Sequence, residues 1–328
     1  MNVLYILGNG FDKAQGMKTS YPEFYEYLKT KEGSPLLEKM KKNITADKTL
    51  WSDMEWALGE YTSKVETAED MDNLHDELSQ YLQKYLTTED RQFRPNDVMR
   101  HGFHSDFIQP ESHLSEVDLV NYRKVLKPII NANASSNKSI YVMTLNYTNT
   151  LEKLLGLNKN ETSKTLNARG DALRDICHIH GRLEDTIIIG VDNEKQIRNT
   201  EFRQMEDVTN FLIKEEANLA MKNLRHSKCE QYVKNANLIV LMGVSWGETD
   251  QRWWTLIGSE LKKRTDLVII NTIYRPNDVP NTRRYKLATV ERDERNRLYK
   301  KLGFQTDEEK ANMSNRVFFA INTSMFKL

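Results

Sequence analysis

Short, nearly continuous runs of apolar residues occur at the start of the chain and again through its second half. Strands covered on both faces of a parallel sheet show this pattern, whereas half-exposed strands alternate between apolar and polar residues. We therefore predict an α/β fold, with a mostly parallel sheet and helices on both of its faces. The expected strands are Asn2–Leu7, Ser139–Leu145, Ile176–Ile179, Thr186–Val191, Asn237–Met242, Asp266–Asn271 and Arg316–Ile321.

Residues from about 20 to 135 carry a different pattern, which is typical of helices. Leu74, Leu78, Tyr81 and Tyr85, for example, follow each other at helical spacing. The first expected strand lies before this stretch, and its expected partners all lie after residue 138. A strand needs neighbours in its own sheet, so we interpret the stretch as a large helical insertion within a single α/β domain, residues 1–328.

The last expected helix, Thr282–Leu302, is rich in Lys and Arg. A charged run of this kind is usually the solvated face of a helix that packs on a sheet, and we prefer this interpretation. A nucleic-acid-processing effector that uses the basic helix is the alternative.

Composition and charge narrow the class of protein. The 328 residues are 39% hydrophobic and contain only 14 Gly and 7 Pro, which excludes collagen-like and mostly disordered chains. The 47 Lys and Arg balance 47 Asp and Glu, so no net charge attracts nucleic acid or a membrane surface. No apolar run is long enough to span a bilayer. Cys177 and Cys229 are too few for a disulfide framework, which favours a reduced, cytoplasmic protein.

The first expected strand ends directly in Gly8-Asn9-Gly10-Phe11-Asp12. Glycines between a strand and a helix let backbone N–H groups approach a phosphate closely. The spacing is not GxGxxG, because Lys13 occupies the sixth position, and it is not a P-loop. Glycines also serve tight turns for steric reasons alone, so the motif favours a phosphate site without establishing one.

Two later strand exits carry polar side chains. Asn146 follows the second expected strand, where its amide can face the ligand crevice of an open α/β sheet, or can cap the next helix. The third expected strand leads into His178 and His180, which share one face of an extended chain. Metal binding is the competing hypothesis for the histidines, but no carboxylate nearby in the sequence completes a ligand set. The further histidines considered for it are His101, His104 and His113.

A second glycine turn, Gly243-Val244-Ser245-Trp246-Gly247, follows the fifth expected strand. Ser245 can contact a ribose or phosphate oxygen there. The string also fits the Gly-x-Ser-x-Gly elbow of serine hydrolases. That elbow is normally followed by an Asp and then a His, and no His follows His226. We therefore place the hydrolase hypothesis behind nucleotide binding.

Together these exits resemble the bacteriophage abortive infection family AbiH, a bacterial anti-phage family that is similar to the sirtuin-like NAD-binding fold. The resemblance extends from residue 8 to residue 250. It rests on Gly8-Asn9-Gly10-Phe11-Asp12, Gly16-Met17-Lys18-Thr19-Ser20-Tyr21, Trp51 with Glu55, Asn146-Tyr147-Thr148, His178-Ile179-His180-Gly181, and Gly243-x-Ser245 with Asp250.

The resemblance implies a Rossmann-like, sirtuin-like domain and a role for each motif. Asn146 and His180 look like the catalytic pair, with Asn146 against the nicotinamide ribose and His180 as general base. The residues implied for NAD binding are Gly8, Asn9, Gly10, Phe11, Asp12, Gly16, Gly243 and Ser245. No metal is implied.

The chain also departs from the sirtuin pattern. Its two cysteines cannot form a four-cysteine zinc module, and Asn9 and Asp12 replace small residues, with Asp12 able to repel phosphate. These departures argue against protein deacetylation. They leave an anti-phage protein that cleaves the nicotinamide bond of NAD, or, as the alternative, a nucleotide-binding sensor without turnover. The implied partners are NAD or a related nucleotide and a phage or host trigger protein; the sequence does not separate a monomer from a homo-oligomer.

Overall fold

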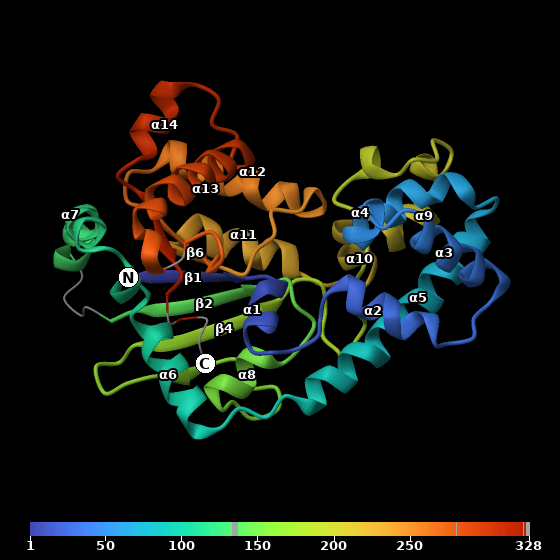
Figure 1. Cartoon of the computed structure of the whole chain (residues 1–328), viewed down its shortest axis with the longest axis horizontal. Helices are drawn as coiled ribbons and strands as arrows, with labels where there is room; N and C mark the ends of the chain where they lie inside the picture. The colour runs from blue at the N-terminus through green and yellow to red at the C-terminus, as the bar shows by residue number, and fades with distance from the viewer. Residues whose placement is uncertain (133–136, 280, 324, 326–328) are drawn as a thin grey trace.

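The computed structural model describes residues 1–132, 137–279, 281–323 and 325, and it contains a seven-stranded sheet in the order β3-β4-β2-β1-β5-β6-β7 (Figure 1). Every strand pair is parallel except β3 with β4. This confirms the expected α/β fold with a mostly parallel sheet. The strands are β1 (Asn2–Leu7), β2 (Ser139–Thr144), β3 (Lys164–Thr165), β4 (Ala172–His178), β5 (Leu238–Met242), β6 (Val268–Ile273) and β7 (Val317–Ile321).

Helices surround the sheet and form a second lobe beside it (Figure 1). They are α1 (Asn9–Ala14), α2 (Tyr21–Lys29), α3 (Pro35–Ala46), α4 (Met54–Tyr61), α5 (Ala68–Gln92), α6 (Asp97–Ile108), α7 (Glu116–Ala132), α8 (Thr150–Leu155), α9 (Glu206–Leu212), α10 (Lys214–Ala220), α11 (Arg225–Asn235), α12 (Gln251–Lys263), α13 (Leu287–Lys301) and α14 (Asp307–Met313).

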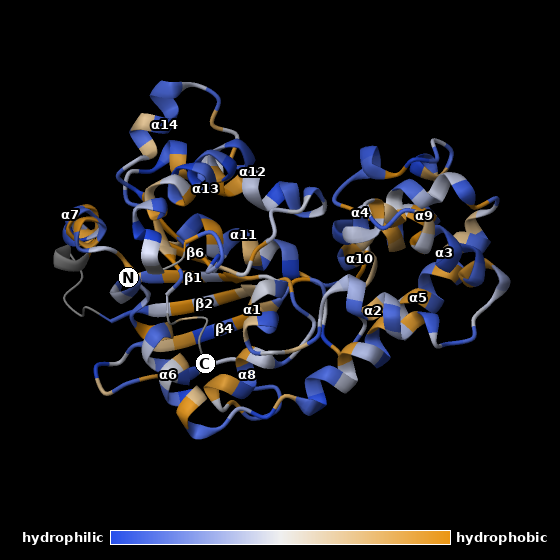
Figure 2. Ribbon diagram, viewed as in Figure 1, coloured by the Kyte–Doolittle hydropathy of each residue, from blue (hydrophilic) through white to orange (hydrophobic). Residues whose placement is uncertain are grey.

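Both faces of the sheet are covered, as the continuous apolar runs predict. On one face, Phe11 of α1 and Phe103 of α6 pack against strand residues such as Val142. On the other face, Trp253 of α12 and Leu298 of α13 belong to the cluster that covers the sheet. Figure 2 shows apolar residues concentrated along the central strands. None of the helices in the described part of the chain combines the length and apolar character needed to cross a bilayer.

The expected helical insertion is largely a lobe with its own apolar cluster. Helices α2 to α5 bury residues such as Phe24 and Leu78 in that cluster. Helices α6 and α7 of the same stretch pack on the sheet instead. The lobe also receives α9 and α10 from a second segment, which the sequence pattern does not predict. The expected end of the insertion, near residue 135, lies outside the described residues.

One expected strand is wrong. Thr186–Val191 forms no ladder in the sheet, and its only bridge joins Val191 to Ile213. The segment is buried, but its backbone carbonyls contact side chains instead of a neighbouring strand. The Tyr147 hydroxyl donates to the Ile188 carbonyl at 3.0 Å, and His75 Nε2 lies 2.9 Å from the Ile189 carbonyl. A buried apolar run can therefore resemble a strand in sequence while it packs in the apolar cluster of the helical lobe.

The C-terminal part contains one helix more than the sequence predicts. The expected helix Thr282–Leu302 is observed as a 3₁₀ segment, Asn281–Lys286, followed by α13. Helix α13 packs on the sheet face through Leu298 and Tyr299, as the preferred interpretation of its charged run predicts. Helix α14 follows it and begins with a capping box between Thr306 and Glu309.

Candidate functional site

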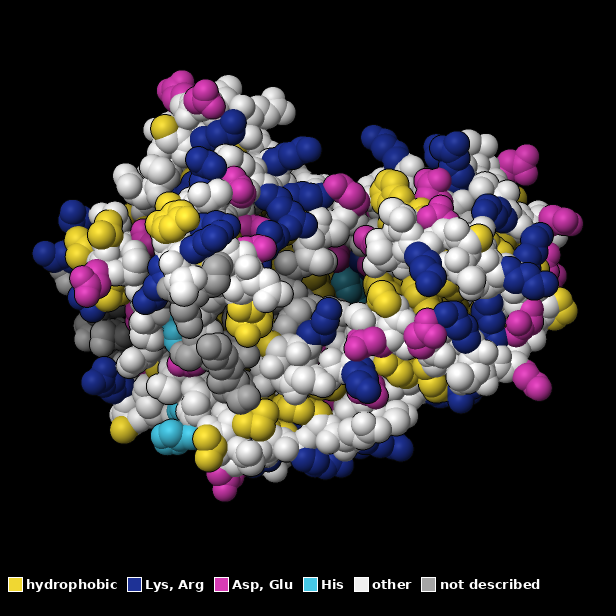
Figure 3. Space-filling model, in the orientation of Figure 1, with side chains coloured by type: hydrophobic (Ala, Val, Ile, Leu, Met, Phe, Trp, Pro, Cys, Tyr) yellow, Lys and Arg dark blue, Asp and Glu magenta, His cyan; other side chains and the backbone are white. Residues whose placement is uncertain are grey.

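A cavity of about 1190 Å³ opens at the carboxyl ends of β1, β2, β5 and β6, between the sheet lobe and the helical lobe. Figure 3 shows the hollow between the two lobes. The chain adds β2 and then β4 on one side of the central strand β1, and later adds β5, β6 and β7 on its other side. The strand order therefore reverses its direction at β1. Ligands of open α/β sheets bind at such a switch point. Of the expected site residues, the cavity is lined by Gly8, Asn9, Gly10, Asp12, Asn146, His180, Gly243 and Ser245.

Two expected nucleotide-binding residues do not line the cavity. Phe11 is 1% exposed and packs in the core of the sheet lobe, with its ring 5.8 Å from that of Phe103. Gly16 lies in the turn after α1 with φ of +78°. Phe11 contributes to the core of the sheet lobe, and Gly16 allows the left-handed turn that follows α1.

The two glycine turns pack against each other at the floor of the cavity. The N–H of Gly8 donates to the Met242 carbonyl, and the N–H of Gly10 donates to the Gly243 carbonyl, both at 2.9 Å. A Cβ on Gly10 would lie 2.6 Å from the Cα of Gly243, so any side chain there would force the turns apart. The glycines thus allow close approach of two backbones. The Gly8 and Gly10 N–H groups, expected as phosphate donors, are engaged within the protein.

Asn146 does not cap a helix. Its side-chain Nδ2 donates to the Gly8 carbonyl at 3.1 Å, which ties the end of β2 to the end of β1. Asp12 lies beside it, 2% exposed, and accepts a 2.5 Å hydrogen bond from the Thr148 hydroxyl. Burial raises the pKa of Asp12 to about 6, although the hydrogen bond from Thr148 opposes the shift. The second carboxyl oxygen of Asp12, Oδ1, is buried without a described hydrogen-bond partner.

His178 and His180 have separate roles. His178, the last residue of β4, places Nδ1 2.9 Å from the Asn146 carbonyl oxygen and Nε2 2.8 Å from Glu152 Oε1. His178 therefore fixes the position of the Asn146 backbone. His180 lies beyond the strand, lines the cavity, and places Nε2 3.3 Å from Asp250 Oδ1.

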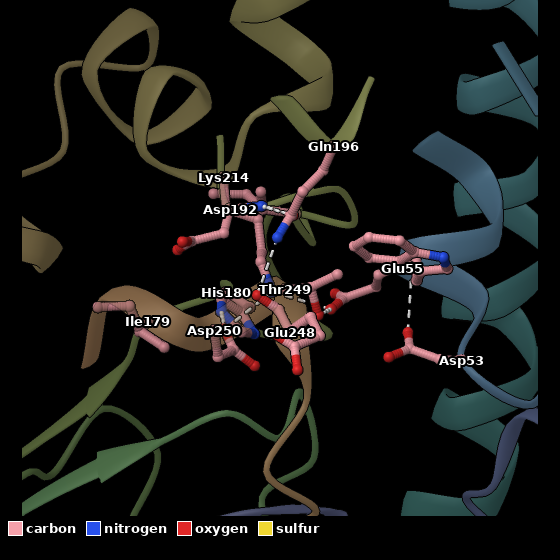
Figure 4. Close-up of polar contacts among 12 residues, drawn as sticks. Asp53, Glu55, Ile179, His180, Asp192, Gln196, Lys214, Glu248, Thr249 and Asp250 are labelled. Atoms are coloured by element: carbon pink, nitrogen blue, oxygen red, sulfur yellow. Dashed lines mark hydrogen bonds and ion pairs between the residues drawn. The ribbon is translucent and has the colours of Figure 1, made fainter. Parts of the chain in front are cut away.

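His180 belongs to a buried charged cluster formed by both lobes (Figure 4). The Lys214 ammonium of α10 lies 2.8 Å from Glu55 Oε2 of α4 and 2.9 Å from Asp250 Oδ1. The Thr249 hydroxyl donates to Glu55 Oε2 at 2.9 Å. Asp250 ends a short 3₁₀ segment, Glu248–Asp250, that leads from the β5 exit into α12. Residues from four parts of the chain thus meet at this cluster, which includes the His180 ring.

Electrostatics favour the charged forms of Lys214 and Asp250, whereas burial raises the pKa of Glu55 although the Lys214 ammonium opposes the shift. Burial alone would raise the pKa of Asp250, but the Lys214 ammonium and the His180 ring hold it well below its usual range. Burial alone would lower the pKa of Lys214, but Asp250 and Glu55 raise it above its usual value. Asp250 is therefore a carboxylate at neutral pH, and its contact with Nε2 can orient the His180 ring.

The β5 exit is strained. Trp246, a bulky residue, has φ of +60°, a left-handed conformation that such residues rarely adopt. Strain of this kind is concentrated at functional sites. The strained residue is Trp246 rather than Ser245, and the 3₁₀ segment separates Ser245 from α12. The geometry of a serine-hydrolase elbow is therefore not formed, which removes the support for that hypothesis.

The histidines considered as metal ligands do not form a cluster with a shared site. His113 Nε2 pairs with Asp106 at 2.9 Å, and His101 and His104 lie on α6. Among the residues that the structure describes, no group of three or more His, Cys, Asp or Glu side chains could hold a metal ion.

Sequence reasoning missed several members of the site. Lys214 has no local signal, because it begins an ordinary charged helix, and only the fold brings it to Glu55, 159 positions away. Glu55 and Asp250 belonged to the family resemblance without an assigned role. The cavity-lining residues Asp53, Thr249, Arg275 and Arg297 were also missed.

A family model matches most of the chain. Curated proteins include no match to this chain. The family model described as bacteriophage abortive infection AbiH matches residues 4–271, which include the motifs from the first glycine turn to the end of the β5 exit. The chain therefore belongs to the bacteriophage abortive infection family AbiH.

Proposed function

We propose that this anti-phage protein binds NAD and hydrolyses the bond between nicotinamide and ribose, so that an infected cell loses its NAD. Membership of the abortive infection family supplies the defence context. The chemistry is inferred from the cavity and from His180.

The position and size of the cavity support a nucleotide ligand. It lies at the switch point of a parallel sheet, where open α/β folds bind nucleotides. Its volume of about 1190 Å³ exceeds the range typical of small-molecule pockets, roughly 300–1,000 Å³. A dinucleotide is a ligand of suitable size.

The observation that carries the proposal is the buried His180–Asp250 pair on the cavity wall, with Nε2 3.3 Å from Oδ1. An imidazole held by a carboxylate can accept a proton from water. The water oxygen would then bond to the ribose C1′ as the C1′–N bond breaks. The bonding electrons neutralise the pyridinium nitrogen, the water proton passes to His180, and the products are nicotinamide and ADP-ribose.

Asn146 would position the ribose or the attacking water in this step. It lines the cavity, and its backbone and side chain are both fixed: His178 contacts its carbonyl oxygen, and its Nδ2 donates to Gly8. A rigid polar group next to the reacting carbon contributes by orientation rather than by proton transfer.

A sensor that binds NAD without cleaving it is the alternative. The observation that favours it is the Glu55–Lys214–Asp250 contact between the lobes, through which an occupied cavity could change the position of the helical lobe. A nucleic-acid effector has less support, because several cations of α13 are paired within the protein, including Arg295 with Glu291 at 2.6 Å.

The test is chromatographic detection of nicotinamide and ADP-ribose after the purified protein is incubated with NAD. We expect release by the wild type and a loss of about 10²- to 10⁴-fold in His180→Ala, the usual contribution of a general base. Asn146→Ala should also lose activity. His101→Ala is the matched control, because His101 is exposed on α6 and does not line the cavity.

Equal rates in the wild type, Asn146→Ala and His180→Ala would contradict the assigned roles. Binding of NAD by calorimetry without release of nicotinamide, both in vitro and in infected-cell extract, would favour the sensor.

A further inference from the structure

Helix α10 contributes two buried side chains to the surroundings of His180. Lys214 and Asn218 lie four positions apart, so they share one face of the helix. The Lys214 ammonium contacts the Asp250 carboxylate. Asn218 is 1% exposed, and its side-chain Nδ2 donates to the Ile179 carbonyl at 3.2 Å. One face of α10 therefore contacts both the acidic partner of His180 and the residue that precedes it; Figure 4 shows Ile179, His180 and Asp250 close together.

The orientation of the Asn218 amide follows from its contacts. Nδ2 also donates to the Lys214 carbonyl, one turn back in α10, at 3.0 Å. Both acceptors are backbone carbonyl oxygens, which can pair only with the NH₂ group of the amide. The amide oxygen, Oδ1, is buried without a described hydrogen-bond partner. Because buried polar atoms are normally paired, the amide is retained at a cost in stability, and its contact with Ile179 offers a functional reason.

The backbone that carries His180 is held on both sides. The Ile179 N–H donates to the Thr144 carbonyl at 3.1 Å, and the Ile179 carbonyl accepts from Asn218. The carbonyl of His180 accepts from the Ile188 N–H at 2.8 Å. The contact with Asn218 is made by a side chain, from a helix that packs against α9 of the helical lobe. The position of His180 therefore depends on α10 as well as on the end of β4.

Asn218 acts on the site from outside the cavity. His180 and Asp250 line the cavity, whereas Asn218 does not. A substitution of Asn218 therefore removes no contact with a bound nucleotide, but it can change the position of the imidazole. Misplacing a reacting group by about 1 Å, even through a distant substitution, can lower a rate by about 10²-fold. The expected effect is on the rate of the chemical step and not on binding.

We propose that Asn218 is a positioning residue, which holds the backbone at His180 so that the imidazole reaches both the cavity and Asp250. This inference rests on the proposed function, in which His180 accepts a proton from water. The contact also links the reaction to the helical lobe, because Asn218 reaches the Ile179 carbonyl only while α10 stays docked beside the end of β4.

The test compares Asn218→Leu with the wild type. Leucine has the branched shape of asparagine and favours a helix, but it has no N–H group for the Ile179 carbonyl. We expect kcat for nicotinamide release to fall about 10- to 10²-fold, with KM changed by less than about twofold. Calorimetry with ADP-ribose, which is not cleaved, measures the affinity and the fraction of binding-competent protein. That affinity should stay the same, and kcat is expressed per competent site.

The position of His180 can also be observed without turnover. The ring of Tyr147 lies 6.4 Å from that of His180, between centroids, so its ring current makes the NMR signal of the His180 Cε1–H group sensitive to the position of the imidazole. The signal is identified by its absence in His180→Ala. We expect it to shift in Asn218→Leu and also in Asn218→Ala, a second variant that removes the amide and adds no atom.

Asn296→Leu is the matched control. Asn296 is exposed on α13 and does not line the cavity. The same substitution there should leave kcat, the ADP-ribose affinity and the His180 signal unchanged. Circular dichroism verifies that each variant is folded.

An unchanged kcat and an unchanged His180 signal in the folded Asn218 variants would overturn the inference. A loss of ADP-ribose affinity as large as the loss of kcat would also overturn it, because Asn218 would then act on binding. If the wild type releases no nicotinamide, the proposed function fails, and the His180 signal alone decides whether Asn218 positions the ring.

Discussion

At the scale of single residues, the most sensitive contact is the Lys214 ammonium between two carboxylates. Its side chain is 4% exposed, so both carboxylates depend on it for a neighbouring positive charge. Removing one partner of a buried ion pair leaves uncompensated charge and typically costs about 3–5 kcal/mol. We expect Lys214→Met to lower the free energy of unfolding by about this amount in urea denaturation.

The control for that variant is Lys29→Met. Lys29 forms a comparable pair with Glu26, but both side chains are exposed, at 40% and 72%. Exposed pairs contribute only about 0–1 kcal/mol. Similar losses of stability in the two variants would contradict the account of the buried cluster.

Asp12 predicts a pH dependence of stability. Its pKa is raised to about 6 by burial, whereas an Asp in an unfolded chain titrates near 3.9. Between these values the folded protein binds a proton that the unfolded chain releases, so stability present at low pH is lost as the pH rises through 6. The loss amounts to about 3 kcal/mol at pH 8.

Asp12→Asn removes this titration but still accepts the Thr148 hydrogen bond. We expect the variant to be more stable than the wild type by about 3 kcal/mol at pH 8, and by less than about 1 kcal/mol at pH 4. Urea denaturation at the two pH values measures the difference. A stability difference that is the same at both would show that Asp12 is not titrating as described.

At the scale of elements, the contact between the two glycine turns fixes the floor of the site. Gly243 has φ of +65°, and a Cβ there would lie 2.2 Å from the backbone nitrogen of Phe11. Gly16 has a similar φ of +78°, but no atom lies within 4 Å of its Cβ position. Alanine substitutions at Gly16 and Gly243 therefore distinguish the free-energy cost of a left-handed backbone from the added cost of steric overlap.

We expect Gly16→Ala to cost about 1–2 kcal/mol through its left-handed backbone alone. Gly243→Ala should cost about 1–3 kcal/mol more, because the added methyl group overlaps the β1 exit. It should also weaken nucleotide binding, since both turns line the cavity. Thermal or urea denaturation measures both variants, and equal costs would argue against the close packing of the turns.

Much of the element-level structure was predictable. Continuous apolar runs identified six strands of the sheet, because strands buried on both faces carry no polar alternation. The same criterion failed at Thr186–Val191, where Tyr147 and His75 side chains bind the backbone of a buried segment. The two-residue strand β3 was too short to carry a pattern.

At the scale of the whole molecule, the site is assembled from both lobes. The position of Asn146 and His180 on the cavity wall was predictable, because polar residues at strand exits meet at one edge of a parallel sheet. The partners of His180 were not predictable in the same way. Lys214 and Glu55 come from helices, and their meeting depends on how α4 and α10 pack in the helical lobe. Periodicity indicates that a helix is buried but not which residue it contacts.

We propose that the protein defends by destroying NAD through His180. The most direct test measures NAD in bacteria during phage infection, in cells that carry the wild type, His180→Ala or His101→Ala. The account predicts that NAD falls after infection with the wild type and with His101→Ala, and stays high with His180→Ala, which also loses protection. Protection by the wild type while NAD remains constant would contradict it.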